Sequence, residues 1–252
     1  GWKSHAKRFL GEKFLEHQWK GEPLNGKVLL VWNDVGMGDI FQFIRYTKPL
    51  IQNGEKIILA PHKSQIAIIK NRLAWKVSKV VDRDSVLPLE NNILHIPLMN
   101  LVGLIDPDTR WGRNWDEKTW ICENRIKEKN KTGICWASNP GDKTMYKYKS
   151  IGIEKILNKM SIERRVSMKD IISLQTDETE THKKYNLKPL IKDWEVTLNL
   201  INNCNIIHSV DTAVAHLAAG SGCEVIMHLN EMYDWRWKGK GPDWYSTIKM
   251  NK

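Results

Sequence analysis

Short runs of β-branched and other apolar residues alternate with segments of helical periodicity along most of the sequence. Such alternation is typical of βα units, in which parallel strands are joined by helices that cross one face of a sheet. The first unit is a strand at 27–32, a loop at 33–39 and a helix at 40–52. The sequence therefore predicts an α/β fold with parallel sheets.

The alternation occurs in two series, and its periodicity lapses between residues 103 and 131. A chain of 252 residues is long enough for two domains that each bury a core. We predict an N-terminal helical segment at 1–18, a Rossmann-like domain with its linker at 19–125 and a second Rossmann-like domain at 126–252. Further strands are predicted at 56–60, 79–81, 93–98, 133–137, 170–175, 205–208 and 224–229, and further helices at 63–73, 151–160, 194–202 and 212–221.

Composition excludes several classes of protein. Hydrophobic residues make up 41% of the chain and charged residues 27%, and the longest apolar runs fall far short of a membrane span. No secretion signal precedes the first strand, so we expect a soluble, cytoplasmic protein. The four cysteines form no CxxC pair, and together with the lack of a dense carboxylate or Cys/His cluster this predicts neither a disulfide framework nor a metal site.

The formal net charge of +10 favours an anionic partner, such as a nucleotide diphosphate, an acidic glycan or the surface of a membrane. The lysines are spread along the whole chain among many Asn and Ile residues, so biased composition explains the charge equally well. Peripheral contact with the inner face of a membrane is one candidate. No nucleic-acid recognition motif accompanies the charge, and we expect no nucleic-acid partner.

The loop at 33–39 is the first candidate site, because open α/β sheets bind ligands at the carboxyl ends of their strands. Gly36 and Gly38 let the backbone turn tightly and approach a ligand. Asp39 lies near the predicted helix start, where a carboxylate either caps the helix or serves as a general base. Spacing alone favours the cap.

A second candidate site opens the predicted helix at 212–221, directly after an apolar strand. Unpaired amides and the helix dipole favour an anion at such a helix start, and the small residues there let it come close. The hydroxyl of Thr212 offers one more donor, and Asp211 is placed as a cap or as a polar anchor. His216 follows Thr212 by four residues and is either within reach of the same ligand or a core histidine.

Two further segments concentrate cationic and aromatic side chains. Residues 137–150 carry three lysines that either neutralise a diphosphate or form a solvated loop. Residues 234–237 (DWRW) offer Arg236, whose guanidinium can fork onto phosphate or carboxylate, and Trp235, whose ring can stack on a sugar or base. A purely structural tryptophan cluster is the alternative for this second segment.

Taken in order, these segments resemble the glycosyltransferase-like region found behind bacterial tetratricopeptide repeats. That region is similar to glycosyltransferase family 9, the lipopolysaccharide heptosyltransferases, and more distantly to protein O-GlcNAc transferases. The resemblance covers about residues 19–246. It rests on 19–27 (WKGEPLNGK), 36–46 (GMGDIFQFIRY), 133–137 (GICWA), 149–150 (KS), 173–175 (SLQ), 209–218 (SVDTAVAHLA) and 234–237 (DWRW).

The resemblance implies the GT-B architecture, with two Rossmann-like domains facing a cleft, and an inverting sugar transfer without a metal or cofactor. The donor is a nucleotide-diphosphate sugar, and the acceptor is a glycan, a lipid-linked molecule or a protein. Asp39 matches the general base, which reverses the expectation from spacing. Donor and phosphate contacts are implied at Ser138, Lys149, Asp211, Thr212, Ala213, Val214 and His216, and sugar or acceptor contacts at Gly36, Gly38, Gln42, Arg45, Trp235 and Arg236.

Other functions are compatible with the same residues. A catalytically inactive module of this fold would bind a nucleotide or glycan, or serve as a scaffold, without transferring a sugar. A nucleotide-sugar epimerase is a further enzymatic alternative. The donor base, the sugar and the acceptor are not fixed by these motifs.

Overall fold

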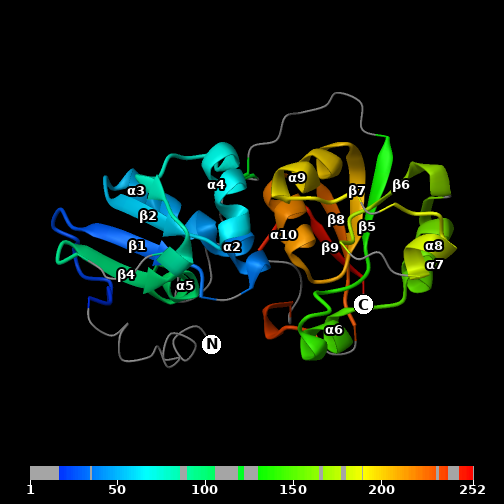
Figure 1. Ribbon diagram of the computed structural model, residues 1–252, viewed down its shortest axis with the longest axis horizontal. Helices are drawn as coiled ribbons and strands as arrows, with labels where there is room; N and C mark the ends of the chain where they lie inside the picture. The colour runs from blue at the N-terminus through cyan, green and yellow to red at the C-terminus, as the bar shows by residue number, and fades with distance from the viewer. Residues whose placement is uncertain are drawn as a thin grey trace. The chain divides into compact units, whose positions relative to one another are not determined.

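The computed structural model describes residues 17–34, 36–85, 90–105, 119–121, 130–164, 167–176, 180–188, 190–230, 233–237 and 244–251. The chain divides into two compact units, residues 1–120 and 121–252 (Figure 1). Each unit contains one parallel sheet, so the α/β class predicted from the alternation is confirmed. Apart from its last two residues, the predicted N-terminal segment at 1–18 lies outside the described residues.

The sheet of unit 1 has the strand order β3-β2-β1-β4, and its described strands are all parallel. Strand β1 carries the sequence VLLVW and has buried side chains on both faces, as expected of an interior parallel strand. The strands are β1 (Val28–Trp32), β2 (Lys56–Ala60), β3 (Lys79–Val80) and β4 (Ile93–Pro97). The helices are α2 (Met37–Phe43), η2 (Ile44–Thr47), α3 (Lys48–Gln52), η3 (Lys63–Gln65), α4 (Ile66–Arg72), η4 (Arg83–Ser85) and α5 (Leu98–Ile105).

The single helix predicted at 40–52 begins three residues earlier and is interrupted by the 3₁₀ turn η2. Pro49 lies in the first turn of α3, where its ring excludes a continuous α-helix through the preceding residues. The hydroxyl of Thr47 donates to the carbonyl of Ile44 at 2.7 Å and stabilises the tightened turn. The early start places Asp39 inside the first turn of α2.

The sheet of unit 2 has the strand order β6-β5-β7-β8-β9, again with parallel neighbours. In Figure 1, α9 and α10 lie against β7 and β8, while α7 and α8 lie together beside β6. The strands are β5 (Lys131–Cys135), β6 (Ile171–Ser173), β7 (Cys204–Ser209), β8 (Glu224–His228) and β9 (Ile248–Asn251). The helices are α6 (Lys143–Lys149), α7 (Ile153–Arg164), η6 (Met168–Asp170), α8 (Glu180–Lys184), α9 (Trp194–Asn202), α10 (Ala213–Gly220) and η7 (Trp235–Trp237).

Small residues bring the backbone segments of unit 2 close together. A Cβ atom on Gly133 would lie 2.5 Å from the side chain of Ile207 and 2.8 Å from that of Leu174, so a larger residue here would force the ends of these side chains to move. On α10, Ala215, Ala218 and Ala219 are buried, which lets the helix pack closely against β7 and β8. The N-terminus of α10 is thereby fixed at the carboxyl edge of the sheet.

Among the described helices, none is both long and apolar enough to cross a membrane.

Candidate functional site

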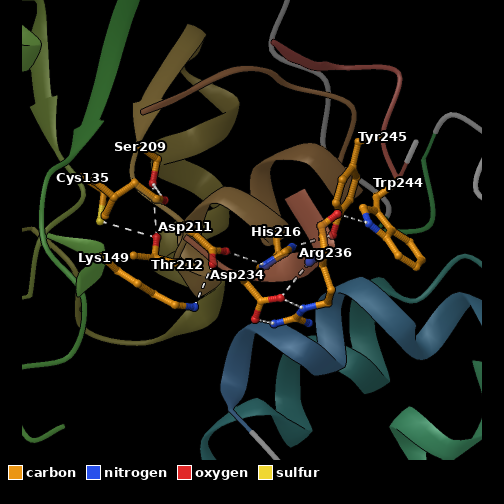
Figure 2. Close-up of polar contacts among 11 residues, drawn as sticks. Cys135, Lys149, Ser209, Asp211, Thr212, His216, Asp234, Arg236, Trp244 and Tyr245 are labelled. Carbon is orange, nitrogen blue, oxygen red and sulfur yellow. Dashed lines mark hydrogen bonds and ion pairs between the residues drawn. The ribbon is translucent and has the colours of Figure 1, made fainter. Parts of the chain in front are cut away.

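The N-terminus of α10 is presented by the end of strand β7. The amide of Val210 donates to the carbonyl of Cys135 at 3.0 Å, which ties the end of β7 to the neighbouring strand β5. Thr212 is the N-cap residue, but within the described chain its side chain makes no capping bond. Its hydroxyl instead lies 3.2 Å from Ser209 Oγ and 3.8 Å from Cys135 Sγ (Figure 2). The first-turn amides are therefore left for another acceptor.

Asp211 is the polar centre of this helix start, and it acts as an anchor rather than as the N-cap. Its side chain is 4% exposed, with Oδ2 2.7 Å from Lys149 Nζ and Oδ1 3.3 Å from His216 Nε2 (Figure 2). Burial raises the pKa of Asp211, but the hydrogen bond from His216 and the charge of Lys149 outweigh it and hold the pKa well below its usual value. Asp211 is thus a buried anion with two nitrogen partners.

His216 is buried and engaged at both ring nitrogens. Nε2 faces Asp211, and Nδ1 lies 2.8 Å from the hydroxyl of Tyr245. The ring of Trp237 stacks on the imidazole with centroids 5.8 Å apart and an interplanar angle of 23°. The ring is thus packed inside the unit and contacts Asp211, and its reach to a ligand stays a prediction.

Lys149 comes from a helix that the sequence did not predict. Residues 143–149 form α6, and Asp142 is its N-cap residue. The carboxylate of Asp142 accepts a hydrogen bond from the amide of Met145 at 3.0 Å. Lys149 ends this helix with its side chain 19% exposed and its ammonium turned toward Asp211. Ser138 precedes α6 and is half-buried. Its backbone amide donates to Ser150 Oγ, next to Lys149, at 3.0 Å.

In unit 1, the predicted glycine loop leads into the start of α2. Gly36 is the N-cap, and Asp39 lies in the first turn with its amide donating to the carbonyl of Gly36 at 3.1 Å. Asp39 is therefore not the N-cap residue of α2, because the helix starts before it. A Cβ atom on Gly36 would lie 3.2 Å from Asp39 Oδ2, so glycine leaves room beside this carboxylate. Gly38 and Asp39 are both half-buried.

Gln42 and Arg45 follow on α2 and η2 and are buried, with 0% and 1% of their surface exposed. The guanidinium of Arg45 lies over the ring of Trp120, 4.7 Å from its centroid, and 5.7 Å from the ring of Tyr46. Trp120 is held in turn by a 2.7 Å hydrogen bond from its indole to the carbonyl of Phe41. In this structure Arg45 supports aromatic packing.

Arg236 forks onto a carboxylate of its own segment. Its Nε and Nη2 atoms each lie 3.0 Å from an oxygen of Asp234, and its amide donates to the same carboxylate at 2.9 Å. Burial raises the pKa of Asp234, but these bonds and the charge of Arg236 outweigh it and keep the pKa below its usual value. Trp235, in contrast, is 45% exposed.

Tyr245 is the residue of the Asp211 cluster that sequence reasoning missed. Its hydroxyl contacts His216, 29 positions earlier in the chain. No local sequence pattern predicts a hydrogen bond between residues so far apart in the chain. Within the described residues, no three His, Cys, Asp or Glu side chains gather as metal ligands.

No protein-family model matches the sequence, and no curated protein is similar to it in sequence. The structure, however, is similar to solved glycosyltransferases. The Escherichia coli heptosyltransferase WaaC with ADP-2-deoxy-2-fluoro heptose superposes with a TM-score of 0.57 at 11% identity, covering 89% of this chain and 92% of that one. A glycosyl transferase of family 9 from Veillonella parvula DSM 2008 gives 0.58 at 8% identity, covering 95% and 88%.

The iron-containing dodecameric glycosyltransferase TibC from enterotoxigenic E. coli H10407 is also similar, with a TM-score of 0.52 and 11% identity. The match covers 81% of this chain but only 58% of TibC, so this chain spans less than two thirds of that protein. At these identities the likeness concerns the fold. The chain has the GT-B-like fold of family 9 structures, as the sequence resemblance predicted.

Proposed function

We propose that unit 2 binds the diphosphate of a nucleotide sugar at the N-terminus of α10. The observation that carries this proposal is the Asp211–Lys149 pair, whose 2.7 Å contact holds an ammonium group at the carboxyl edge of the sheet. An ammonium has three N–H donors, and Asp211 occupies one side of it. The first turn of α10, formed by Ala213, Val214 and Ala215, adds backbone amides and the positive end of the helix dipole.

The structural neighbours support a nucleotide as the ligand. Structures with this fold have been solved with ADP in WaaC and with ADP-D-beta-D-heptose in TibC. Charge at the proposed site is compatible with such a ligand, because the first turn of α10 carries no acidic residue and the carboxylate before it, Asp211, is paired with Lys149 and His216. We do not assign the base or the sugar.

We further propose that the chain is a glycosyltransferase that inverts the anomeric centre without a metal. The acceptor hydroxyl attacks the anomeric carbon, and the bond from that carbon to the diphosphate oxygen breaks. The first-turn amides, the Thr212 hydroxyl and Lys149 stabilise the negative charge that develops on the leaving diphosphate. Asp39 takes the proton of the attacking hydroxyl as general base. The acceptor class is a glycan, a lipid-linked molecule or a protein.

The test of donor binding is a thermal-shift panel of nucleoside diphosphates and their sugars. A ligand that binds the folded state at about 100 times its Kd stabilises the protein by about 2.7 kcal/mol, which is readily seen as a rise in Tm. Lys149→Met should weaken the shift by lowering affinity about tenfold. Lys183→Met is the matched control, because Lys183 is exposed on α8 and pairs with Glu180 at 2.9 Å.

Two outcomes would count against the proposal. If no nucleoside diphosphate or nucleotide sugar raises Tm, donor binding fails. If a ligand binds but no sugar is transferred or hydrolysed with any acceptor tried, the chain is a binding module and the catalytic part of the proposal fails.

A further inference from the structure

Asp211, which pairs with Lys149, also contacts His216. His216 in turn contacts the hydroxyl of Tyr245, which lies in a distant segment of the chain. Asp211 Oδ1 faces His216 Nε2 at 3.3 Å, and His216 Nδ1 faces the Tyr245 hydroxyl at 2.8 Å (Figure 2). We infer that Tyr245 is a positioning residue of the donor site, because its hydroxyl fixes His216 as the neutral tautomer with the proton on Nε2. The inference rests on the proposed donor site and adds a residue to it.

For a neutral imidazole, the chemistry of the three groups allows one consistent arrangement of protons. An ionised carboxylate only accepts hydrogen bonds, so the Nε2 atom that faces Asp211 must carry a hydrogen. In a neutral imidazole the other nitrogen, Nδ1, is then an acceptor. The hydroxyl of Tyr245 donates to it, and both ring nitrogens of His216 are satisfied. The opposite tautomer would set the lone pair of Nε2 against the Asp211 carboxylate.

Packing prevents the imidazole of His216 from turning over to exchange its two nitrogens. The ring of Trp237 stacks on it, and the ring of Tyr245 lies 5.8 Å away at an interplanar angle of 41°. All three residues are buried, with exposed fractions of 4% or less. The neighbouring Trp244 donates from its indole to the carbonyl of Arg236 at 3.1 Å, which ties the segment before β9 to η7. The hydroxyl of Tyr245 is thereby held at a fixed place.

The consequence for the donor site follows from how Asp211 shares its two oxygens. While His216 donates to Oδ1, Oδ2 is left to Lys149, and the ammonium stays beside the start of α10. If the Tyr245 hydroxyl is removed, Nδ1 becomes a buried acceptor without a donor, and the Nε2–H tautomer loses its advantage. Asp211 then depends on Lys149 for both oxygens, and the ammonium is less available to a phosphate.

The first experiment measures the tautomer directly, on the full chain labelled with ¹⁵N at histidine. Two-bond ¹⁵N–¹H correlation spectra distinguish the Nε2–H tautomer, the Nδ1–H tautomer and the imidazolium. We expect the Nε2–H form for His216 in the wild-type protein at neutral pH and a mixture of forms in Tyr245→Phe. The Nδ1–H form or the imidazolium in the wild type would overturn the inference, and this reading requires no variant to fold.

The second experiment measures affinity for ADP and UDP by calorimetry. Tyr245→Phe should raise Kd by about three- to tenfold, the loss expected for one buried hydrogen bond. Tyr185→Phe is the matched control, since it removes an equivalent hydroxyl that donates to Glu154 at 3.0 Å on the exposed surface of α7 and α8. It should change neither Kd nor the tautomer of His216.

The outcomes separate this inference from the proposed function. If Tyr245→Phe lowers Tm but leaves the tautomer and Kd unchanged, the residue is only structural and the inference is overturned. If the wild type binds neither ADP nor UDP nor any other nucleoside diphosphate, the proposed function fails, while the tautomer of His216 still decides the arrangement of protons.

Discussion

The starts of α2 and α10 occupy corresponding places in the two sheets but carry different charged groups. Each helix follows an interior strand of a parallel sheet, β1 in unit 1 and β7 in unit 2. Their N-cap residues, Gly36 and Thr212, both have extended backbones and, within the described chain, make no side-chain cap. In α2, however, the first turn carries the carboxylate of Asp39, whereas α10 begins with small apolar residues beside the Lys149 ammonium.

The comparison shows that geometry alone does not decide what such a helix start binds. The dipole and the unpaired amides favour an anion at both places. At α2 this preference is already met by Asp39, a carboxylate that would repel a phosphate and suits the role of proton acceptor. At α10 the preference is unmet by the chain's own first turn. In our proposal, the phosphates therefore bind to unit 2 and the base belongs to unit 1.

The largest expected effect comes from Asp39→Asn, which removes the base but keeps the size of the side chain. Sugar transfer should fall by about 10²- to 10⁴-fold, as for other general bases, while Kd for a nucleoside diphosphate stays unchanged. A turnover assay measures the fall in sugar transfer, and calorimetry measures the unchanged Kd. Asp84→Asn is the control, because the Asp84 side chain is 73% exposed in the same unit. An unchanged turnover, or a parallel loss of binding, would contradict the division of roles between the helices.

Asp211→Asn should be the most destabilising change at α10. It leaves Lys149 and His216 without their anion, and removing one partner of a buried ion pair costs about 3 kcal/mol. Urea unfolding measures the loss. The same change at Asp170, which pairs with Lys131 at 2.9 Å but is 37% exposed, should cost under about 1 kcal/mol. Equal losses of unfolding free energy in the two variants would mean that the buried pair at Asp211 stabilises the protein no more than the exposed pair at Asp170.

Unit 2 should also lose stability in mild acid because of a buried histidine pair. His228 Nε2 lies 3.0 Å from His208 Nδ1, and burial, with the nearby His208 and Lys159, lowers the pKa of His228 from 6.5 to about 3. The unfolded chain therefore binds the extra proton first, and stability falls as pH drops from about 6.5 toward 3. We expect this group to cost about 2 kcal/mol between pH 7 and pH 5.

Denaturant unfolding at several pH values measures this loss. His228→Gln should flatten the dependence, and Lys159→Met should reduce it, because the charge of Lys159 is one cause of the lowered pKa. If the wild-type slope survives in His228→Gln, another group is responsible.

The smallest expected effect is that of Thr212→Val. Since the Thr212 hydroxyl does not cap α10, its loss should lower the free energy of unfolding by well under about 1 kcal/mol. The control is Asp142→Ala, which removes the side-chain cap of α6 and should cost about 1 kcal/mol. Affinity for a nucleoside diphosphate should fall about threefold, the loss of one hydrogen bond to the ligand. A larger loss of stability in Thr212→Val would show that the hydroxyl supports the helix after all.

The elements around the proposed phosphate site were predictable because their local signals are strong. The helix expected at 212–221 is Ala213–Gly220, the strand expected at 205–208 is Cys204–Ser209, and the helix expected at 194–202 has the same bounds in the structure. An apolar strand followed by a small-residue helix leaves few alternatives. In contrast, every residue of α6 is exposed or half-exposed, so its KTMYKYK sequence carries no apolar periodicity to reveal a helix.

The edge strand β9 was also missed, because it is short and only its first residue is buried. The site residues divide in a similar way. Asp211, Thr212 and His216 were named from one contiguous motif. Their partners come from other elements, since Lys149 ends α6 and Tyr245 precedes β9. Such pairings depend on how the sheet assembles, which residue spacing does not encode. The expected link to tetratricopeptide repeats stays a prediction.

The most direct test of the central claim is a ¹⁵N-amide titration of the full chain with a nucleoside diphosphate. The account predicts that the amides of Ala213, Val214 and Ala215 shift together and saturate with the Kd found by calorimetry, while those of Met37 and Ile40 in α2 do not. Lys149→Met should weaken the response about tenfold. Saturating shifts at the start of α2 with none at α10 would contradict the assignment of the phosphates to unit 2.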